Sequence, residues 1–238
     1  MGKQEIANYS LGQLPLLPRI LERKGEINCV AIEANGLDRR QVGELWDGIA
    51  LTNLEKEVLT ALRLIAPGVE GLNLISNPTS TTGERIPIVK IEGIDDPLPL
   101  RSLGDGMQRM LGTALALVNA KGGLLLIDEI ENGLHYSVQP DLWHLIFQVA
   151  RRLNVQVFAT THSWDCIEGL QRAAVEDNQE EGLLIRLESR KSGIVATLFD
   201  KQELQSRYIL FHSCSSRDRS LDRFLVSLPC RHLPRNFH

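Results

Sequence analysis

The second half of the chain alternates short apolar runs with longer stretches in which apolar residues recur at helical spacing. Residues 124–127 are an apolar run and residues 155–160 a mainly apolar one, each bounded by glycine or polar residues, a pattern typical of buried strands. Residues 105–119, 137–153 and 163–174 follow the helical pattern. Because helices alternate with buried strands, this half predicts an α/β fold with a parallel sheet at its core.

The first half predicts shorter elements, which we expect to form a lobe set on that core. The expected elements are strands at 27–34, 69–76 and 86–92 and helices at 37–49 and 53–65. Beyond the core, residues 183–187 and 194–199 predict two antiparallel edge strands around a Lys-Ser-Gly turn.

The run at residues 124–127 is expected to be a central parallel strand, buried on both faces, which ends at Asp128 and Glu129. Ligands of open α/β sheets bind at the C-terminal ends of the strands. Two adjacent carboxylates there suit phosphoryl transfer from a nucleotide, because the first can hold Mg²⁺ and the second can polarise an attacking water. Taken alone, the same residues fit equally well a strand followed by a solvated acidic turn.

Two further polar features border the predicted core. A glycine-containing turn at residues 100–109 leads into a helix, and backbone N–H groups and the helix dipole suit such a turn to an anion. Taken alone, this turn also fits an ordinary helix start. His162 follows the strand at residues 155–160, so we expect it at the same sheet edge as Asp128 and Glu129. A single histidine is otherwise more often packed or solvated than catalytic.

Composition narrows the class of protein. A net charge of −4 and a pI near 5.9 give no overall attraction to nucleic acid or to anionic membranes. No apolar run approaches the length of a membrane span, and the N-terminus lacks the apolar segment of a secretory signal. The four cysteines are widely spaced, without a C-x-x-C pair, so they predict neither a zinc site nor a disulfide framework. We expect a cytoplasmic protein without membrane association.

The C-terminal residues 206–238 differ from the rest in charge. They contain six Arg, no Lys, two Asp and no Glu, and so carry +4, whereas the other 205 residues, with 20 basic and 28 acidic side chains, carry −8. We expect an atypical basic tail that is not native to the fold, because Arg with scattered Cys, His and Ser suits translation out of the native frame. A nucleic-acid-binding arm is the alternative.

Three segments together resemble the motifs of one ATPase family. Ser-Leu-Gly-Asp-Gly at residues 102–106 resembles the signature loop of ABC-type ATPases, and Ala-Thr-Thr-His-Ser at residues 159–163 resembles their switch-histidine segment. Leu-Leu-Leu-Ile-Asp-Glu-Ile-Glu-Asn-Gly-Leu-His at residues 124–135 resembles the Walker B segment of OLD-like AAA family ATPases. The resemblance extends over residues 27–204, and the Glu-x-x-Leu-His that follows the two carboxylates makes it specific.

The resemblance implies a set of roles around ATP and Mg²⁺. Asp128 would place Mg²⁺, Glu129 would be the general base, and His162 would sense or orient the γ-phosphate. The signature loop would cap the γ-phosphate of ATP bound to a second subunit through Ser102, Gly104 and Gly106. Such proteins dimerise head to tail with nucleotide between them, so a second copy or an intact homologue is the expected partner.

One departure from the family is serious. The sequence contains no G-x-x-x-x-G-K-[ST], the P-loop that holds the β- and γ-phosphates. We therefore expect a partial ABC-type P-loop NTPase domain that lacks the N-terminal P-loop strand, a truncated or split ATPase. Its expected parts are a lobe of helices and short strands at 1–98, the half of the ATPase core with the signature, Walker B and switch-histidine segments at 99–205, and the tail at 206–238.

Three functional hypotheses follow. The first is ATP binding and hydrolysis once a P-loop is supplied by a partner or a missing segment. The second is a non-catalytic module that docks on an intact homologue and offers its signature loop. The third is the ATPase subunit of a nuclease or defence system, with the nuclease in a partner protein, because no cluster of acidic residues on predicted strands follows His162 that could hold two metal ions.

Overall fold

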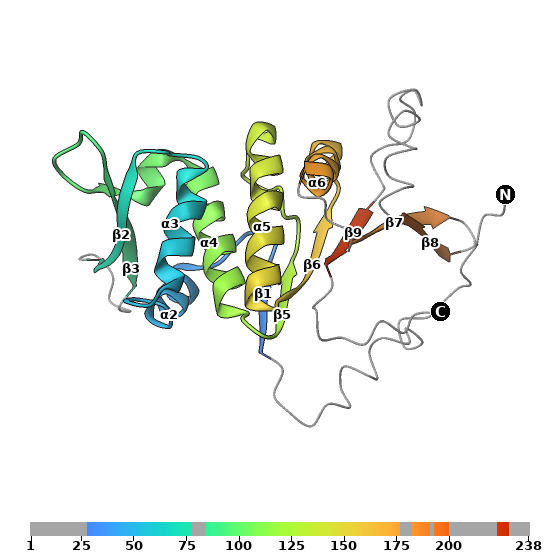
Figure 1. The fold of residues 1–238 in the computed structure, drawn as a ribbon, viewed down its shortest axis with the longest axis horizontal. Helices are drawn as coiled ribbons and strands as arrows, with labels where there is room; N and C mark the ends of the chain where they lie inside the picture. Colours follow the sequence, from blue (N-terminus) through green and yellow to red (C-terminus); the bar gives the residue numbers. More distant parts are fainter. Residues whose placement is uncertain (1–27, 78–83, 177–181, 191–192, 200–222, 229–238) are drawn as a thin grey trace.

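The computed structural model describes residues 28–77, 84–176, 182–190, 193–199 and 223–228 (Figure 1). The large-sheet strands are β1 (Cys29–Ile32), β5 (Leu124–Ile127), β6 (Gln156–Thr161), β7 (Leu183–Arg190), β8 (Gly193–Phe199) and β9 (Arg223–Leu228). Their order is β1-β5-β6-β9-β7-β8, with β1, β5 and β6 parallel and the remaining pairs antiparallel. The predicted α/β class with a parallel core is confirmed, as is the antiparallel pairing of β7 with β8.

The helices of the core are α4 (Asp105–Asn119), α5 (Gln139–Leu153) and α6 (Trp164–Glu176), with the 3-10 turns η2 (Leu100–Leu103) and η3 (Tyr136–Val138) before α4 and α5. Figure 1 shows α4, α5 and α6 side by side in front of the parallel strands. Burial along β5 alternates accordingly: Leu125 and Ile127 are buried, but Leu126 is 38% exposed. The prediction that this strand is buried on both faces is therefore wrong, since the described helices cover one face of the parallel strands and successive side chains alternate between faces.

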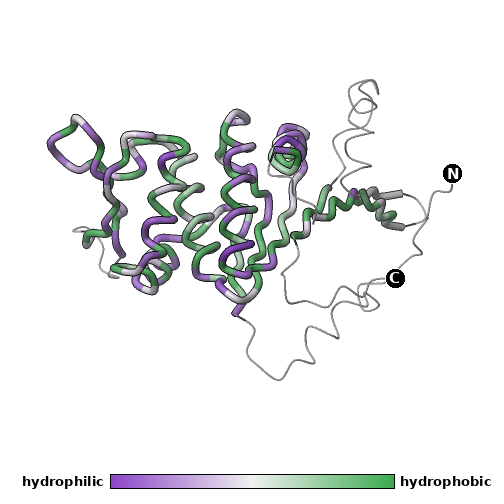
Figure 2. Tube along the Cα trace, viewed as in Figure 1, coloured by the Kyte–Doolittle hydropathy of each residue, from purple (hydrophilic) through white to green (hydrophobic). Residues whose placement is uncertain are grey.

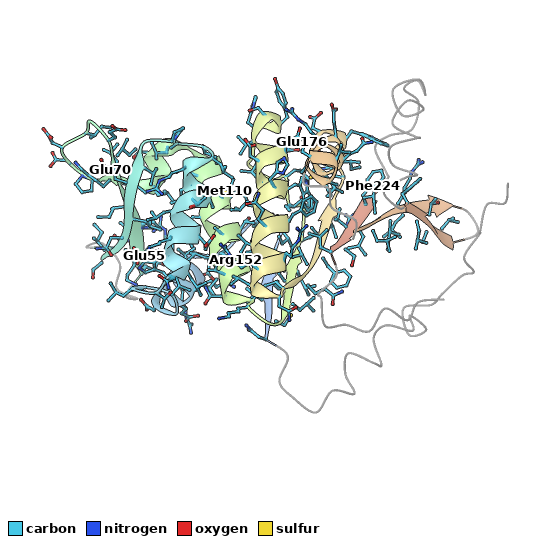
Figure 3. All side chains as sticks on the ribbon, viewed as in Figure 1. Glu55, Glu70, Met110, Arg152, Glu176 and Phe224 are labelled. Atoms are coloured by element: carbon cyan, nitrogen blue, oxygen red, sulfur yellow. The ribbon has the colours of Figure 1, made fainter. Side chains whose placement is uncertain are left out.

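Helix α4 is the centre of the packed interior. It contacts β1, α2 (Arg39–Asp47), α3 (Leu54–Arg63) and α5, and nearly every residue from Met107 to Val118 is buried. A helix covered on all sides must be apolar all round, which explains why its buried surface is much wider than one stripe. Met110 lies in this interior (Figure 3).

The prediction that the first-half elements form a lobe is wrong for the strand at 27–34, which is β1 and pairs with β5 in the large sheet. The first-half helices α2 and α3 pack against α4. An antiparallel sheet of β2 (Val69–Ser76), β3 (Arg85–Ile91) and β4 (Leu98–Pro99) packs with α2 and α3. Arg85 of β3 bonds both carboxylate oxygens of Asp47, at 2.7 and 2.6 Å, and thereby ties the sheet to α2. The ends of these elements agree with the expected ranges to within a few residues.

Strand β9 is the main unexpected element. It comes from residues 223–228, inside the predicted tail, and lies between β6 and β7 in the sheet. Phe224, Val226 and Leu228 are buried on one face, and Phe224 meets the ring of Trp164 edge-on with centroids 5.2 Å apart (Figure 3). Figure 2 shows the mainly hydrophobic character of this end of the sheet. The structure thus places six residues of the tail in the fold, and the remaining tail residues lie outside the described ranges.

Replacing Phe224 by Ala is expected to lower the free energy of unfolding by about 3 kcal/mol, the cost of emptying a buried aromatic site. Leu225→Ala on the other face of β9 is the matched control, with an expected loss of about 1 kcal/mol because that side chain is only half-buried. Urea denaturation measures both. Equal small losses would show that β9 is not part of the folded sheet.

Leu51, which precedes α3, has φ 63° and a side chain 99% exposed. This left-handed backbone costs a non-glycine residue about 1 kcal/mol, without any burial to offset it. Leu51→Gly is therefore expected to stabilise the protein by about 0.5 kcal/mol after the larger entropy of unfolded glycine is counted. Leu51→Ala removes the same exposed apolar side chain but keeps the strain, so its urea midpoint should stay unchanged; a gain in both variants would rule out the backbone explanation.

Within the described part of the chain, no helix combines the length and the apolar character that crossing a bilayer requires.

Candidate functional site

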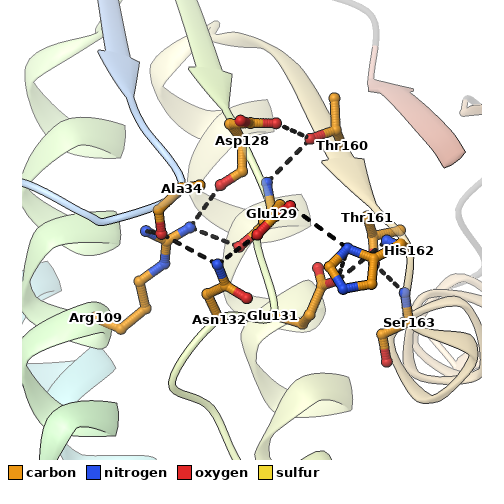
Figure 4. Close-up of polar contacts among 10 residues, drawn as sticks. All are labelled: Ala34, Arg109, Asp128, Glu129, Glu131, Asn132, Thr160, Thr161, His162 and Ser163. Atoms are coloured by element: carbon orange, nitrogen blue, oxygen red, sulfur yellow. Dashed lines mark hydrogen bonds and ion pairs between the residues drawn. The ribbon is translucent and has the colours of Figure 1, made fainter.

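Three parallel strands end side by side at one edge of the large sheet. Strand β1 is followed by Glu33, β5 by Asp128 and Glu129, and β6 by His162. Figure 4 shows Asp128, Glu129 and His162, which follow β5 and β6, gathered at that edge. His162 Nδ1 lies 3.7 Å from Glu129 Oε1, so residues 33 positions apart in sequence meet here because parallel strands share an edge.

Asp128 and Thr160 supply oxygen atoms at this edge. The Thr160 hydroxyl donates to Asp128 Oδ1 and accepts the backbone N–H of Glu129 at 3.0 Å. Carboxylate and hydroxyl oxygens are hard ligands that fit Mg²⁺, which is usually completed by waters and nucleotide phosphates. Among the residues that the structure describes, no group of three or more His, Cys, Asp or Glu side chains is arranged to hold a metal. A Mg²⁺ held by Asp128 and Thr160 would therefore take its other ligands from nucleotide and water.

Glu129 has an unusual backbone. Its φ of 48° is in the left-handed region, which non-glycine residues rarely adopt and which persists only where the surroundings hold it. The Asn132 side chain donates to Glu129 Oε2 at 2.7 Å and to the Ala34 carbonyl at 3.2 Å. The turn thus places the Glu129 carboxylate at the C-terminal edge of the sheet, with its side chain 28% exposed. One carboxylate oxygen accepts from Asn132, and the other faces His162.

Glu131 lies behind His162 and is almost fully buried. Its Oε1 accepts the His162 backbone N–H at 3.1 Å and lies 3.4 Å from His162 Nδ1. The Glu131 side chain is 8% exposed, whereas that of His162 is 57% exposed. The imidazole is therefore held from one side and open on the other.

Arg109 of α4 connects the ends of β1 and β5. One terminal nitrogen donates to the carbonyls of Glu33 and Ala34 at 3.0 and 3.3 Å, and the other to those of Asp128 and Glu129 at 2.8 and 2.7 Å (Figure 4). Burial lowers the pKa of this guanidinium, an effect opposed by the nearby carboxylates, yet an arginine stays charged. Its planar fork thus fixes the turn that carries the two carboxylates.

The predicted signature loop lies at the start of α4. Ser102 is in η2, and Gly104, with φ 93°, is the N-cap of α4 without a side-chain capping bond. A Cβ on Gly106 would lie 3.0 Å from the carbonyl oxygen of Gly133, so a glycine allows this loop to approach the chain after β5. In the described chain, these loop residues make no hydrogen bond to Asp128, Glu129 or His162, and Ser102 and Gly104 are exposed.

Four residues of the strand-end edge have no role predicted from the sequence: Arg109, Glu131, Asn132 and Thr160. Arg109 is a charged residue within a nearly continuous apolar helix, which is a signal that a buried partner must exist. Asn132 and Thr160 gave no such signal, because a polar residue in a turn or at a strand end is ordinary.

Residues 88–165 match the family model described as "AAA domain, putative AbiEii toxin, Type IV TA system". The matched segment runs from β3 into the first turn of α6 and includes the glycine turn, both carboxylates and His162. The chain is also 34% identical over 91 residues to the Helicobacter pylori protein named "ATP/GTP phosphatase". That alignment covers 37% of this chain and 25% of the relative, so the chain matches about a quarter of the relative's length.

Solved structures of SMC ATPase heads are partly similar. One, described as "Structural biochemistry of ATP-driven dimerization and DNA stimulated activation of SMC ATPases", has a TM-score of 0.48 and 13% identity and covers 74% of this chain and 99% of its own. The SMC head domain from Thermotoga maritima has a TM-score of 0.42 and 14% identity and covers 71% of this chain and 52% of its own.

Proposed function

We propose that the chain contributes the signature-loop, Walker B and switch-histidine half of an ABC-type, OLD-like ATPase that binds and hydrolyses ATP with Mg²⁺. The observation that carries the proposal is the meeting of Asp128, Glu129 and His162 at the ends of two parallel strands. The match of residues 88–165 to an AAA domain and the name of the Helicobacter pylori relative support the same chemistry.

In this proposal Asp128 and Thr160 would hold Mg²⁺, which when bound neutralises charge on the nucleotide phosphates. Glu129 orients a water and accepts its proton, using the oxygen that is not bonded to Asn132. His162 extends its exposed ring edge toward the γ-phosphate. All three groups are held by backbone and side-chain bonds before any nucleotide binds, so little reorganisation is needed.

The signature loop would serve a second subunit. Gly104 and Asp105 are exposed, and the first turn of α4 has no side-chain cap. The Met107 N–H donates to the Gly104 carbonyl, which leaves the N–H groups of Asp105 and Gly106 to face an anion. A head-to-tail dimer with a second copy or an intact homologue would place a bound γ-phosphate there.

The phosphate cradle is the part that these 238 residues do not contain in the form G-x-x-x-x-G-K-[ST]. We propose that it comes from a partner chain or from a segment outside this sequence. Without it, a base that accelerates hydrolysis by about 10²–10⁴-fold has no bound phosphate to act on. The same fact favours the second function: a non-catalytic module that docks on an intact homologue and offers its signature loop.

Titration of the purified chain with a fluorescent ATP analogue and Mg²⁺, followed by turnover assays, tests the proposal. We expect no binding and no turnover for the chain alone, and binding with turnover after addition of a homologue whose sequence contains the P-loop. Tight binding and Glu129-dependent turnover by the chain alone would overturn the need for an external P-loop. If the mixture turned over ATP no faster than the homologue alone, the proposed ATPase role of the chain would be overturned.

A further inference from the structure

We propose that Glu131 is a positioning residue that fixes the imidazole of His162 with Nδ1 inward and Nε2 outward, and so keeps His162 from pairing with Glu129. The part concerning the nucleotide rests on the proposed function, whereas the contact itself does not. Nothing in the motif resemblance or in the matched relatives assigns this task to Glu131.

One oxygen of Glu131 meets His162 twice. Oε1 accepts the backbone N–H at 3.1 Å and lies 3.4 Å from the ring nitrogen Nδ1 (Figure 4). A shared acceptor for the backbone and the ring of one residue restricts the side-chain torsions of that residue as well as its place. The nitrogen that a histidine presents outward is set by the bond that its other nitrogen makes, so this contact leaves Nε2 as the outward nitrogen.

The burial of Glu131 is costly and therefore needs an explanation. The side chain is 8% exposed, and within the described residues its second oxygen, Oε2, is buried without a hydrogen-bond partner. Burying a carboxylate with an unpaired oxygen destabilises the fold by roughly several kcal/mol, and a positioning role for Glu131 would explain why such a group is present. The charge of Arg109 offsets part of this cost at a distance.

The competing partner of His162 is Glu129, at 3.7 Å from Nδ1. Both carboxylates reach the same ring nitrogen, and the shorter contact belongs to Glu131. If Glu131 were absent, Nδ1–H would turn to Glu129 and occupy the oxygen that must accept a proton from water. Glu131 thus has two effects: it orients the histidine, and it leaves the proposed base free.

The test reads the tautomer of the His162 ring by long-range ¹H–¹⁵N NMR on the whole chain, at about pH 8.5 so that an ordinary imidazole is neutral. The His162 signal is identified by its loss in His162→Gln. We expect the Nδ1–H tautomer in the unmodified protein and in Glu131→Gln, whose amide oxygen still accepts. In Glu131→Ala we expect the Nδ1–H of His162 to lose its hydrogen bond to Glu131, and the ¹⁵N chemical shift of Nδ1 to change as a result. The matched control Glu70→Ala, at an exposed position on β2, should leave the signal unchanged.

An Nε2–H tautomer in the unmodified protein would overturn the proposal. Because this measurement uses the unmodified protein, it does not depend on whether any variant folds. An unchanged signal in a folded Glu131→Ala would also overturn it. In the mixture with a P-loop-bearing homologue, Glu131→Ala should lower the added turnover by about 100-fold with little change in KM, while Glu131→Gln retains most of it. An Nδ1–H tautomer in the unmodified protein and a changed Nδ1 shift in Glu131→Ala, without turnover in any mixture, would contradict the proposed function alone and leave the positioning role supported.

Discussion

Replacing Glu129 by Gln is expected to lower the ATP turnover that the chain adds to a P-loop-bearing homologue by a factor of about 10²–10⁴. The amide has nearly the same shape, so the bond from Asn132 at 2.7 Å can be replaced by one to the Gln oxygen, and the turn held by Arg109 is unaffected. What is lost is the ability to take a proton from water. Nucleotide binding should therefore remain while hydrolysis stops.

The measurement is phosphate release by the mixture at saturating ATP and Mg²⁺, with binding of the fluorescent analogue measured in parallel. Glu33→Gln is the matched control, because Glu33 lies at the same sheet edge but contributes its backbone carbonyl to Arg109. That variant should keep full turnover. If both Glu129→Gln and Glu33→Gln kept full turnover, the chain would act as a docking module, and the catalytic base would belong to the homologue.

Replacing Arg109 by Ala is expected to lower the free energy of unfolding by about 4 kcal/mol. The substitution removes four hydrogen bonds to backbone carbonyls of two strand ends and takes away the positive charge of Arg109, which interacts favourably with the buried Glu131. Arg109→Lys keeps the charge but cannot reach two pairs of carbonyls at once, so its loss should be intermediate.

Urea denaturation of the two variants measures these losses. The matched control is Arg172→Ala, which removes another helical arginine, 67% exposed and paired with Glu176 one turn away. Because exposed pairs of this kind contribute little, its expected loss is within about 0.5 kcal/mol. A loss below about 1 kcal/mol for Arg109→Ala would mean that the strand ends hold their arrangement without the guanidinium.

Local sequence patterns determined most of the secondary structure and the position of the candidate site. The apolar runs and helical spacings predict the parallel core, and residues 69–76 are predicted as the strand that the structure has as β2. The meeting of Asp128, Glu129 and His162 was also predictable, because parallel strands place their C-terminal ends at one edge whatever their separation in sequence. The roles of these residues, and of Ser102, Gly104 and Gly106, remain predictions.

Only the tertiary structure decided the contacts that join distant segments. The insertion of β9 between β6 and β7 depends on pairing with strands far away in sequence, and its six residues carry too short a pattern to predict it. The exposure of Leu126 depends on which face the helices cover. The hydrogen bonds of Arg109 to two strand ends, and the contacts of Glu131 with His162, depend on the directions of side chains where strands and helices pack together. Local patterns fix periodicity and strand ends, whereas burial and partner choice are set by the whole packed molecule.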